Sequence, residues 1–215
     1  MTNFRKIQQI LNEPLLNNLN RLLMLKYKLT NTIIYKSSFK HMGKGSLIIK
    51  PMIITNPHHM EIGDRVFIRN GARIETYVTN ECRIPELIIG DNTNIEQNVH
   101  IICHNRIHIG SNVSITGNCT IVDTTHPYED VNDPIKIGAR ILDDDASVEI
   151  GDGCFIGFGS MILPNVKIGE YTIIGANSVV TKDIPSYCVA VGSPAKVVKA
   201  YNADKKCWPS IPQST

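Results

Sequence analysis

The sequence predicts an all-β fold in which short parallel strands wind into a triangular prism, a parallel β-helix preceded by a short helical segment. Two observations predict it. Between residues 150 and 185 a β-branched aliphatic residue returns at every sixth position, and glycine follows it in four of six repeats. A step of six matches neither the 3.6-residue period of a helix nor the two-residue alternation of a strand. Short strands joined by turns fit it, with three steps making one coil of about 18 residues.

The aliphatic column is long enough to exclude coincidence. Six such residues in a row have a chance probability of roughly one in ten thousand at average composition. They are Ile150, Ile156, Ile162, Ile168, Ile174 and Val180. The same step starts at Ile48 and Ile54 and returns in three shorter runs, namely Ile62, Ile68 and Ile74, then Ile89, Ile95 and Ile101, then Ile109, Ile115 and Ile121. Stacked coils bury such a column and pair their backbones in parallel ladders.

The first 45 residues are predicted to be a helical segment. One apolar stripe includes Phe4 and Ile7, and after Pro14 a second one runs from Leu15 to Leu23. We expect these stripes to pack on the prism or on a partner subunit, with a weaker option of surface binding through nearby lysine and arginine side chains. Residues 31–35 are predicted to form a short strand. The prism is expected over residues 46–200, followed by a tail over 201–215.

Composition excludes several classes of protein. The net charge of +2 and the absence of a basic run argue against nucleic-acid binding. No run of about 18 apolar residues predicts a membrane span, and the N-terminus does not have the pattern of a signal peptide. None of the six cysteines forms a Cys-x-x-Cys pair, and Cys119 and Cys154 occupy positions where the repeat needs a small residue. A reducing, cytoplasmic environment fits this usage.

Two segments depart from the plain repeat in ways that indicate chemistry. The repeat stops after Ile121 at Asp123-Thr124-Thr125-His126-Pro127 and resumes at Ile150, so residues 123–149 are predicted to form an excursion from the prism. Long loops on rigid scaffolds commonly carry functional residues. The second segment runs from Ile174 to Pro185 and is followed by Gly192-Ser193-Pro194-Ala195-Lys196.

These motifs resemble the bacterial hexapeptide-repeat acyltransferases over about three quarters of the chain. The Thr-Thr-His-Pro element is similar to that of the galactoside and maltose acetyltransferase branch, where the histidine is the catalytic base. The C-terminal motif is similar to the acetyl-CoA-binding end of the same family. The resemblance implies a left-handed prism, acetyl-CoA as acyl donor, no required metal, and a homotrimer with active sites between subunits.

The resemblance also implies roles for individual residues. His126 is expected to take the proton of the attacking hydroxyl, which suits an imidazole at neutral pH. A backbone amide at Gly157 or Phe158 is expected to stabilise the oxyanion, although Phe158 is bulkier than usual there. The acetyl-CoA contacts are expected at Ala176, Thr181, Lys182 and Lys196, where lysines offer charge to phosphate. Weaker candidates for acceptor binding are Glu96, Asn98 and Asp123.

Several alternatives stay open. Within the family, the acceptor is a saccharide hydroxyl or, as the second choice, the amine of a nucleotide-linked sugar. A carbonic anhydrase on the same prism would need three histidine ligands, and the expected spacing is absent among His100, His104, His108 and His126. A non-catalytic structural prism would leave the His126 and Pro194-Ala195-Lys196 elements unexplained.

Overall fold

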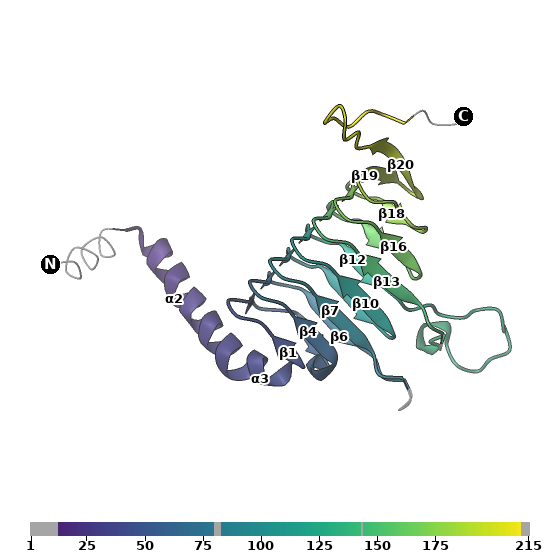
Figure 1. Cartoon of the computed structure of the whole chain (residues 1–215). Helices are drawn as coiled ribbons and strands as arrows, with labels where there is room; N and C mark the ends of the chain where they lie inside the picture. The colour runs from purple at the N-terminus through teal and green to yellow at the C-terminus, as the bar shows by residue number, and fades with distance from the viewer. Residues whose placement is uncertain (1–12, 80–82, 143, 212–215) are drawn as a thin grey trace.

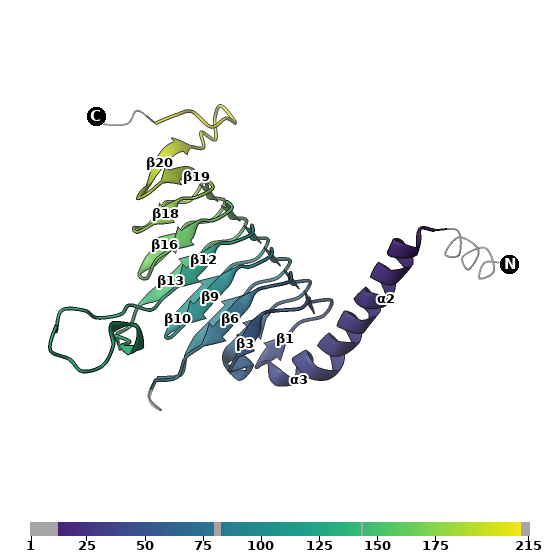
Figure 2. The same ribbon diagram turned by 180° about the vertical axis from the view of Figure 1, so that it is seen from behind.

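The computed structural model describes residues 13–79, 83–142 and 144–211. Three sheets of short strands form the sides of a triangular prism (Figure 1; Figure 2 shows the opposite side). The first sheet contains β1 (His41–Met42), β4 (Met60–Ile62), β7 (Glu86–Ile89), β10 (Arg106–Ile109), β13 (Ser147–Ile150) and β16 (Val166–Ile168), in that order. Every pairing within it is parallel. The sheet begins with β1, which lies before residue 46 and pairs with β4.

The other two sheets follow the same plan. The second contains β2 (Leu47–Ile48), β5 (Phe67–Ile68), β8 (Asn94–Ile95), β11 (Ser114–Ile115), β14 (Phe155–Ile156), β17 (Ile173–Ile174), β19 (Cys188–Gly192) and β20 (Ala195–Ala200). The third contains β3 (Ile53–Thr55), β6 (Arg73–Thr76), β9 (His100–Cys103), β12 (Thr120–Val122), β15 (Met161–Ile162) and β18 (Val179–Val180). We call the turns from the second sheet to the third the 2–3 edge, and those from the third to the first the 3–1 edge.

The six-residue step is confirmed as the interior of the prism. Ile109 pairs with Ile150 in the first sheet, Ile115 with Ile156 in the second, and Ile121 with Ile162 in the third. These side chains are all essentially inaccessible to solvent. Cys119 and Cys154 are buried in the same core, as their small-residue positions predict. Each coil is therefore held to the next by an aliphatic column inside and a parallel ladder around it.

The corners of the prism explain why asparagine recurs beside the aliphatic positions. Asn98 and Asn118 have φ values of 56° and 59° on successive coils of the 2–3 edge, and Asn177 has a φ of 56° two coils further on, after Gly159 at 70°. This left-handed conformation is unfavourable for most residues, but asparagine tolerates it well. The Asn98 Nδ2 donates to the Asn118 Oδ1 at 3.2 Å, so the turn side chains also link neighbouring coils.

The N-terminal segment corrects one sequence prediction. Helix α2 (Leu15–Thr30) continues without interruption through a π-helical turn, η1 (Asn31–Tyr35), into α3 (Lys36–Ser38). The predicted strand at residues 31–35 is therefore wrong. The buried Asn31 side chain accepts from the Ile48 amide at 2.7 Å and donates to the Ile48 carbonyl oxygen at 2.9 Å. These bonds pair the helix with the first coil. The apolar positions predicted at residues 4–11 lie outside the described residues.

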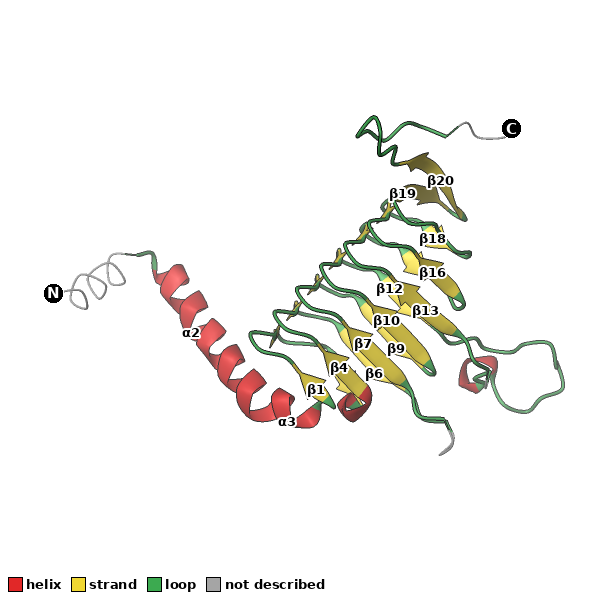
Figure 3. Ribbon diagram, viewed as in Figure 1, coloured by secondary structure: helices red, strands yellow, loops and turns green. Residues whose placement is uncertain are grey.

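Other elements complete the molecule, as Figure 3 shows by colour. Short 3₁₀ turns occur at η2 (Pro57–His59) and η3 (Ile137–Ala139), the latter within the excursion. At the C-terminal end β20 runs antiparallel to β19, unlike the ladders beneath it. Among the residues that the structure describes, no helix is both long and apolar enough to cross a membrane.

Candidate functional site

The excursion leaves the prism at the 3–1 edge, between β12 and β13, and His126 lies at its root. The His126 Nδ1 is 2.6 Å from the carbonyl oxygen of Arg140. Because a carbonyl oxygen only accepts hydrogen bonds, Nδ1 carries the proton in the neutral ring, and Nε2 keeps a free lone pair. A second bond, from the Leu142 amide to the Thr125 carbonyl oxygen at 3.0 Å, closes the same root. The exposed imidazole is thus held in the tautomer that a general base needs.

The Arg140 guanidinium organises the rest of the excursion. It donates to the carbonyl oxygens of Ile135 at 2.7 Å, Asp130 at 2.9 Å and Asp133 at 2.9 Å. It also pairs with the Asp133 carboxylate at 3.2 Å, and only 10% of its side chain is exposed. A planar fork with five N–H groups can satisfy several carbonyls at once. The sequence analysis missed Arg140 because a loop without a repeat gives no indication of which carbonyls its arginine will reach.

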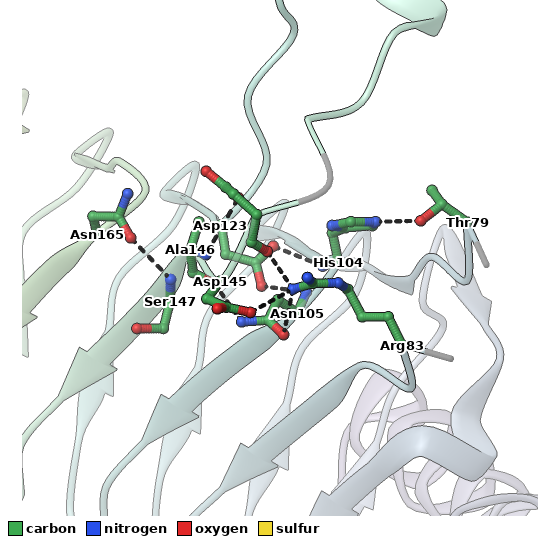
Figure 4. Close-up of polar contacts among 10 residues, drawn as sticks. Thr79, Arg83, His104, Asn105, Asp123, Asp145, Ala146, Ser147 and Asn165 are labelled. Atoms are coloured by element: carbon green, nitrogen blue, oxygen red, sulfur yellow. Dashed lines mark hydrogen bonds and ion pairs between the residues drawn. The ribbon is translucent and has the colours of Figure 1, made fainter. Parts of the chain in front are cut away.

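Asp123 performs a structural task at the point where the excursion begins (Figure 4). Its buried carboxylate accepts from the amide of His104 at 2.6 Å and from the amide of Asn105 at 2.9 Å. Burial raises the pKa of Asp123 above its ordinary value, and these amide donors act in the opposite direction. This carboxylate therefore bonds to the preceding coil of the 3–1 edge, and among the described residues the His126 ring is not one of its hydrogen-bond partners.

Arg83 ties the excursion to the shorter loop between β6 and β7 (Figure 4). Its Nη1 donates to the carbonyl oxygen of Asp144, to the Asp145 carboxylate at 3.0 Å and to the Asn105 Oδ1 at 3.2 Å. The buried His104 is also tied to this shorter loop, since its Nε2 lies 2.6 Å from the Thr79 hydroxyl. Sequence reasoning missed both residues, because each acts between segments far apart in the chain.

A cavity of about 580 Å³ opens beside His126, between the excursion and Thr79. Its lining contains Pro127, next to the histidine, and three carboxylates, of Glu129, Asp130 and Asp133, against the single guanidinium of Arg140, which pairs with Asp133. Carboxylate oxygens accept hydrogen bonds from hydroxyl groups and repel phosphates. The cavity is therefore suited to a polar, uncharged or cationic group.

The 2–3 edge carries most of the residues expected at acetyl-CoA. Gly157 and Ala176 stack on consecutive coils, so closely that a Cβ at Gly157 would lie 2.5 Å from the Ala176 nitrogen. The Gly157 amide donates to the Ile174 carbonyl oxygen at 2.8 Å, within the ladder. The Phe158 amide is then the remaining candidate for an oxyanion donor, beside a half-exposed ring. Lys196 faces Val191 in the β19–β20 hairpin, which the Gly192 amide fastens to the Ser178 hydroxyl at 3.0 Å.

The other expected residues divide between the two edges. Glu96 and Asn98 follow β8 on the 2–3 edge, where Glu96 pairs with Arg69 at 2.7 Å. Thr181 and Lys182 follow β18 on the 3–1 edge and are exposed, on the same edge as His126. One chain therefore places the histidine and most of the expected acetyl-CoA residues on different edges, with the third sheet between them.

The outer face of the third sheet carries a polar group that the sequence analysis did not single out. The buried Glu75 carboxylate accepts from the hydroxyls of Thr55 at 3.1 Å and Tyr77 at 3.2 Å, and it pairs with Arg73. His100 is the register partner of Arg73, and its Nε2 is buried without a hydrogen-bond partner among the described residues. Burial and the Arg73 charge lower the pKa of His100. Within the described ranges, no cluster of three or more His, Cys, Asp or Glu side chains could hold a metal ion.

Comparison with known proteins decides the family. Residues 147–182 match the model of the bacterial transferase hexapeptide (six repeats). The chain is 30% identical over 163 residues to WbbJ of Escherichia coli, named as a lipopolysaccharide biosynthesis O-acetyl transferase, with 74% of this chain and 80% of WbbJ covered. It is also 30% identical over 174 residues to the Escherichia coli galactoside O-acetyltransferase, with 80% and 77% covered. The chain belongs to the hexapeptide-repeat transferase family.

Further similarities are consistent with this membership. A Schizosaccharomyces pombe protein named as an acetyltransferase is 43% identical over 95 residues, which span 43% of this chain and 42% of that protein. A crystal structure of AntD, an N-acyltransferase from Bacillus cereus in complex with dTDP and 3-hydroxybutyryl-CoA, superposes with a TM-score of 0.65. It covers 81% of this chain and 90% of AntD at 22% identity, which establishes a shared fold. The predicted left-handed parallel β-helix is confirmed, and the family's reaction class is acetyl transfer.

Proposed function

We propose that this hexapeptide-repeat transferase moves an acetyl group from acetyl-CoA to a hydroxyl of a saccharide, with His126 as general base. The observation that carries the proposal is the 2.6 Å contact of the His126 Nδ1 with the Arg140 carbonyl oxygen, which leaves Nε2 free to accept a proton. The acidic cavity beside Pro127 supports a hydroxyl-bearing acceptor over one that brings a nucleotide diphosphate, because its carboxylates repel phosphates.

The proposed reaction needs no group beyond the two substrates. The His126 Nε2 removes the proton from the acceptor hydroxyl as its oxygen attacks the thioester carbonyl carbon. The resulting oxyanion is stabilised by the Phe158 amide. Collapse of this intermediate breaks the carbon–sulfur bond, and the imidazolium returns its proton to the leaving thiolate. In this proposal Ala176, Thr181, Lys182 and Lys196 bind CoA, the lysines by pairing with its phosphates.

We propose further that the active site lies between subunits of a homotrimer. The base is on the 3–1 edge, whereas Gly157, Phe158, Ala176 and Lys196 are on or above the 2–3 edge. The 2–3 edge of a neighbouring copy placed against the excursion would complete the site. The protein would then have three times the chain mass of 23.9 kDa in solution.

The first experiment is calorimetric titration with acetyl-CoA, followed by a thiol-release assay over a panel of sugars, nucleotide-linked amino sugars and serine. We expect release with a saccharide, and a loss of about 100- to 10,000-fold in turnover for His126→Ala with acetyl-CoA binding retained. His108→Ala, on the outer face of the first sheet, is the matched control. Turnover that survives in His126→Ala would remove the histidine from the mechanism, and the absence of acetyl-CoA binding would refute the whole proposal.

The intersubunit arrangement has its own test. His126→Ala and Ala176→Phe are each expected to be inactive, since one lacks the base and the other obstructs the acetyl-CoA arm. Co-expression of the two variants would assemble some sites from an intact edge of each chain, and activity would return. If co-expression restores nothing while both variants remain trimeric, the site lies within one chain.

A further inference from the structure

We propose that the N-terminal end of this protein is a docking surface for an anionic phospholipid membrane, formed by the outer side of α2 and by a lysine-lined cavity at its base. Three observations support this: an apolar stripe directed away from the prism, an uneven distribution of charge along the chain, and a cavity lined by some of the same lysines. The proposal does not depend on which acceptor the enzyme uses.

The apolar stripe of α2 has no partner within the described chain. It consists of Leu15, Leu19, Leu22, Leu29 and Ile33, whose side chains are between 50% and 85% exposed. Their spacing of three, four and seven residues places them along one side of the helix. The opposite side faces the prism, where Met24 and Tyr27 are partly buried and Asn31 is fully buried. Figures 1 and 2 show α2 extending away from the prism.

The stripe is broad as well as exposed. Leu16 and Leu23 widen it on one flank and Leu25 on the other, and all three are at least 40% exposed. Two helices in a coiled coil would bury only a narrow stripe, with two apolar positions in every seven residues. Lys28 and Lys36 border this apolar side on the flank of Leu25, since the side opposite the stripe faces the prism. An apolar side bordered by basic residues is typical of helices that lie in the interface of a bilayer.

Charge favours lipid over another copy of the chain. Between residues 14 and 60 there are seven lysines and arginines and no aspartate or glutamate, whereas residues 61–215 carry 13 basic and 19 acidic residues. Identical helices side by side would bring like charges together, including Lys26, which lies between Leu22 and Leu29 on the stripe. In a membrane interface, the long stem of Lys26 can reach the phosphates instead. Arg21 is partly neutralised by Glu13 at 2.7 Å, and Lys40 by Glu61 at 2.7 Å.

A cavity of about 300 Å³ lies where the helix meets the first coils. Its lining includes Lys28, Lys36 and Lys44, together with the hydroxyl-bearing Thr32. The neighbouring Asp64 carboxylate accepts from the Lys44 amide at 2.6 Å, so that hydrogen bond already engages one of its oxygens. Lysines around a small cavity beside an apolar helix suit the phosphate of a lipid headgroup whose chains lie against the leucines.

The test is co-sedimentation of the full-length protein with vesicles. We expect binding to vesicles made of equal parts phosphatidylcholine and phosphatidylglycerol, weakening as sodium chloride is added, and little binding to phosphatidylcholine alone. Lys28→Gln with Lys36→Gln should weaken binding by roughly fivefold for each charge removed. Leu22→Gln with Leu29→Gln should weaken it by about tenfold for each leucine. All four side chains are exposed, so circular dichroism should confirm an unchanged fold.

A matched control is Lys199→Gln with Lys205→Gln, which removes the same charge near the other end of the prism and should leave vesicle binding unchanged. Equal binding to neutral and anionic vesicles, or none to either, would overturn the proposal. So would a fall in molar mass by light scattering when Leu22 and Leu29 are replaced in the absence of lipid, because the stripe would then be covered by another copy. Acetyl transfer to a soluble acceptor is measured separately, so failure of either proposal can be recognised.

Discussion

The Nδ1 of His126 lies 2.6 Å from the backbone carbonyl oxygen of Arg140, and the Arg140 side chain in turn donates to four other carbonyl oxygens of the same excursion. One residue thus fixes the imidazole through its main chain and shapes the surrounding loop through its guanidinium. In the proposed mechanism Arg140 is therefore a positioning residue that does not touch the reacting atoms, and its role can be separated experimentally from catalysis and from folding.

Replacing Arg140 with lysine should lower turnover without unfolding the prism. Lysine keeps the charge but cannot reach several carbonyls with one planar group, so the excursion loosens around His126. A misplacement of about 1 Å in a catalytic group can lower the rate by on the order of 100-fold. Steady-state kinetics should show this loss in kcat with the KM for acetyl-CoA unchanged, and Lys136→Ala in the same loop should behave as the parent. A fall in the melting temperature comparable to that of a core substitution would instead assign Arg140 a general structural role.

Replacing Asp123 with asparagine should destabilise the 3–1 edge. The two carboxylate oxygens accept from the amides of His104 and Asn105, and an asparagine can offer only one acceptor to them. A buried amide without its partner costs about 1–3 kcal/mol. Chemical denaturation should show this loss, whereas Asp145→Asn should change stability by less than about 0.5 kcal/mol because Asp145 is 96% exposed. Equal stability of the two variants would contradict the structural role of Asp123.

Two glycines should respond very differently to alanine. A Cβ at Gly157 would meet backbone atoms of the next coil at 2.5–2.7 Å, whereas one at Gly138 would meet nothing within 4 Å. Forcing neighbouring coils apart costs about 1–3 kcal/mol, which corresponds to a melting temperature lower by roughly 5 °C. Differential scanning calorimetry on Gly157→Ala and Gly138→Ala should separate the two, and a stable Gly157→Ala would show that the coils can part locally.

The stability of the protein should decrease as the pH falls below about 6.5. Burial lowers the pKa values of His100 and His59, so the folded chain binds fewer protons than the unfolded chain just below the ordinary histidine value. Between the lowered and the ordinary histidine pKa values, the free energy of unfolding therefore increases with pH and decreases as the pH falls. Melting temperatures between pH 7 and pH 5 should show the slope, and His100→Asn should reduce it. An unchanged slope would mean that His100 is solvated in both states.

The repetitive part of the fold could be predicted from the sequence, because every coil needs an aliphatic side chain at the same inward-facing positions. Ile162 and Ile174 must face inward for the same reason as Ile150, so a single period locates all three. The end of the helical segment was harder to predict from the sequence, because Thr32, Ile33 and Ile34 are β-branched and favour a strand in isolation. They instead continue the helix, and Asn31, at its junction with the π-helical turn, bonds to both backbone groups of Ile48.

The candidate site divides in the same way. The position of His126 at the root of the excursion could be predicted, because the repeat is interrupted over residues 123–149. Its role as general base stays a prediction. The partners of Arg83 and Arg140 were not, because a hydrogen bond between a loop guanidinium and a distant carbonyl leaves no periodic signal. The division of the expected residues between two edges also required the structure, since it depends on how many turns separate them.

The reversal of chain direction at β20 has a consequence for the molecule as a whole. A stack of near-identical parallel coils has no intrinsic length, and a bare terminal coil would offer its backbone groups to the first coil of another molecule. Such end-to-end addition is how fibres grow. Here the antiparallel hairpin covers the last strand of the second sheet, and Asn31 bonds to both backbone groups of Ile48 in the first strand of the same sheet. At both ends of the second sheet, backbone groups that another molecule could pair with are thus already bonded within the chain.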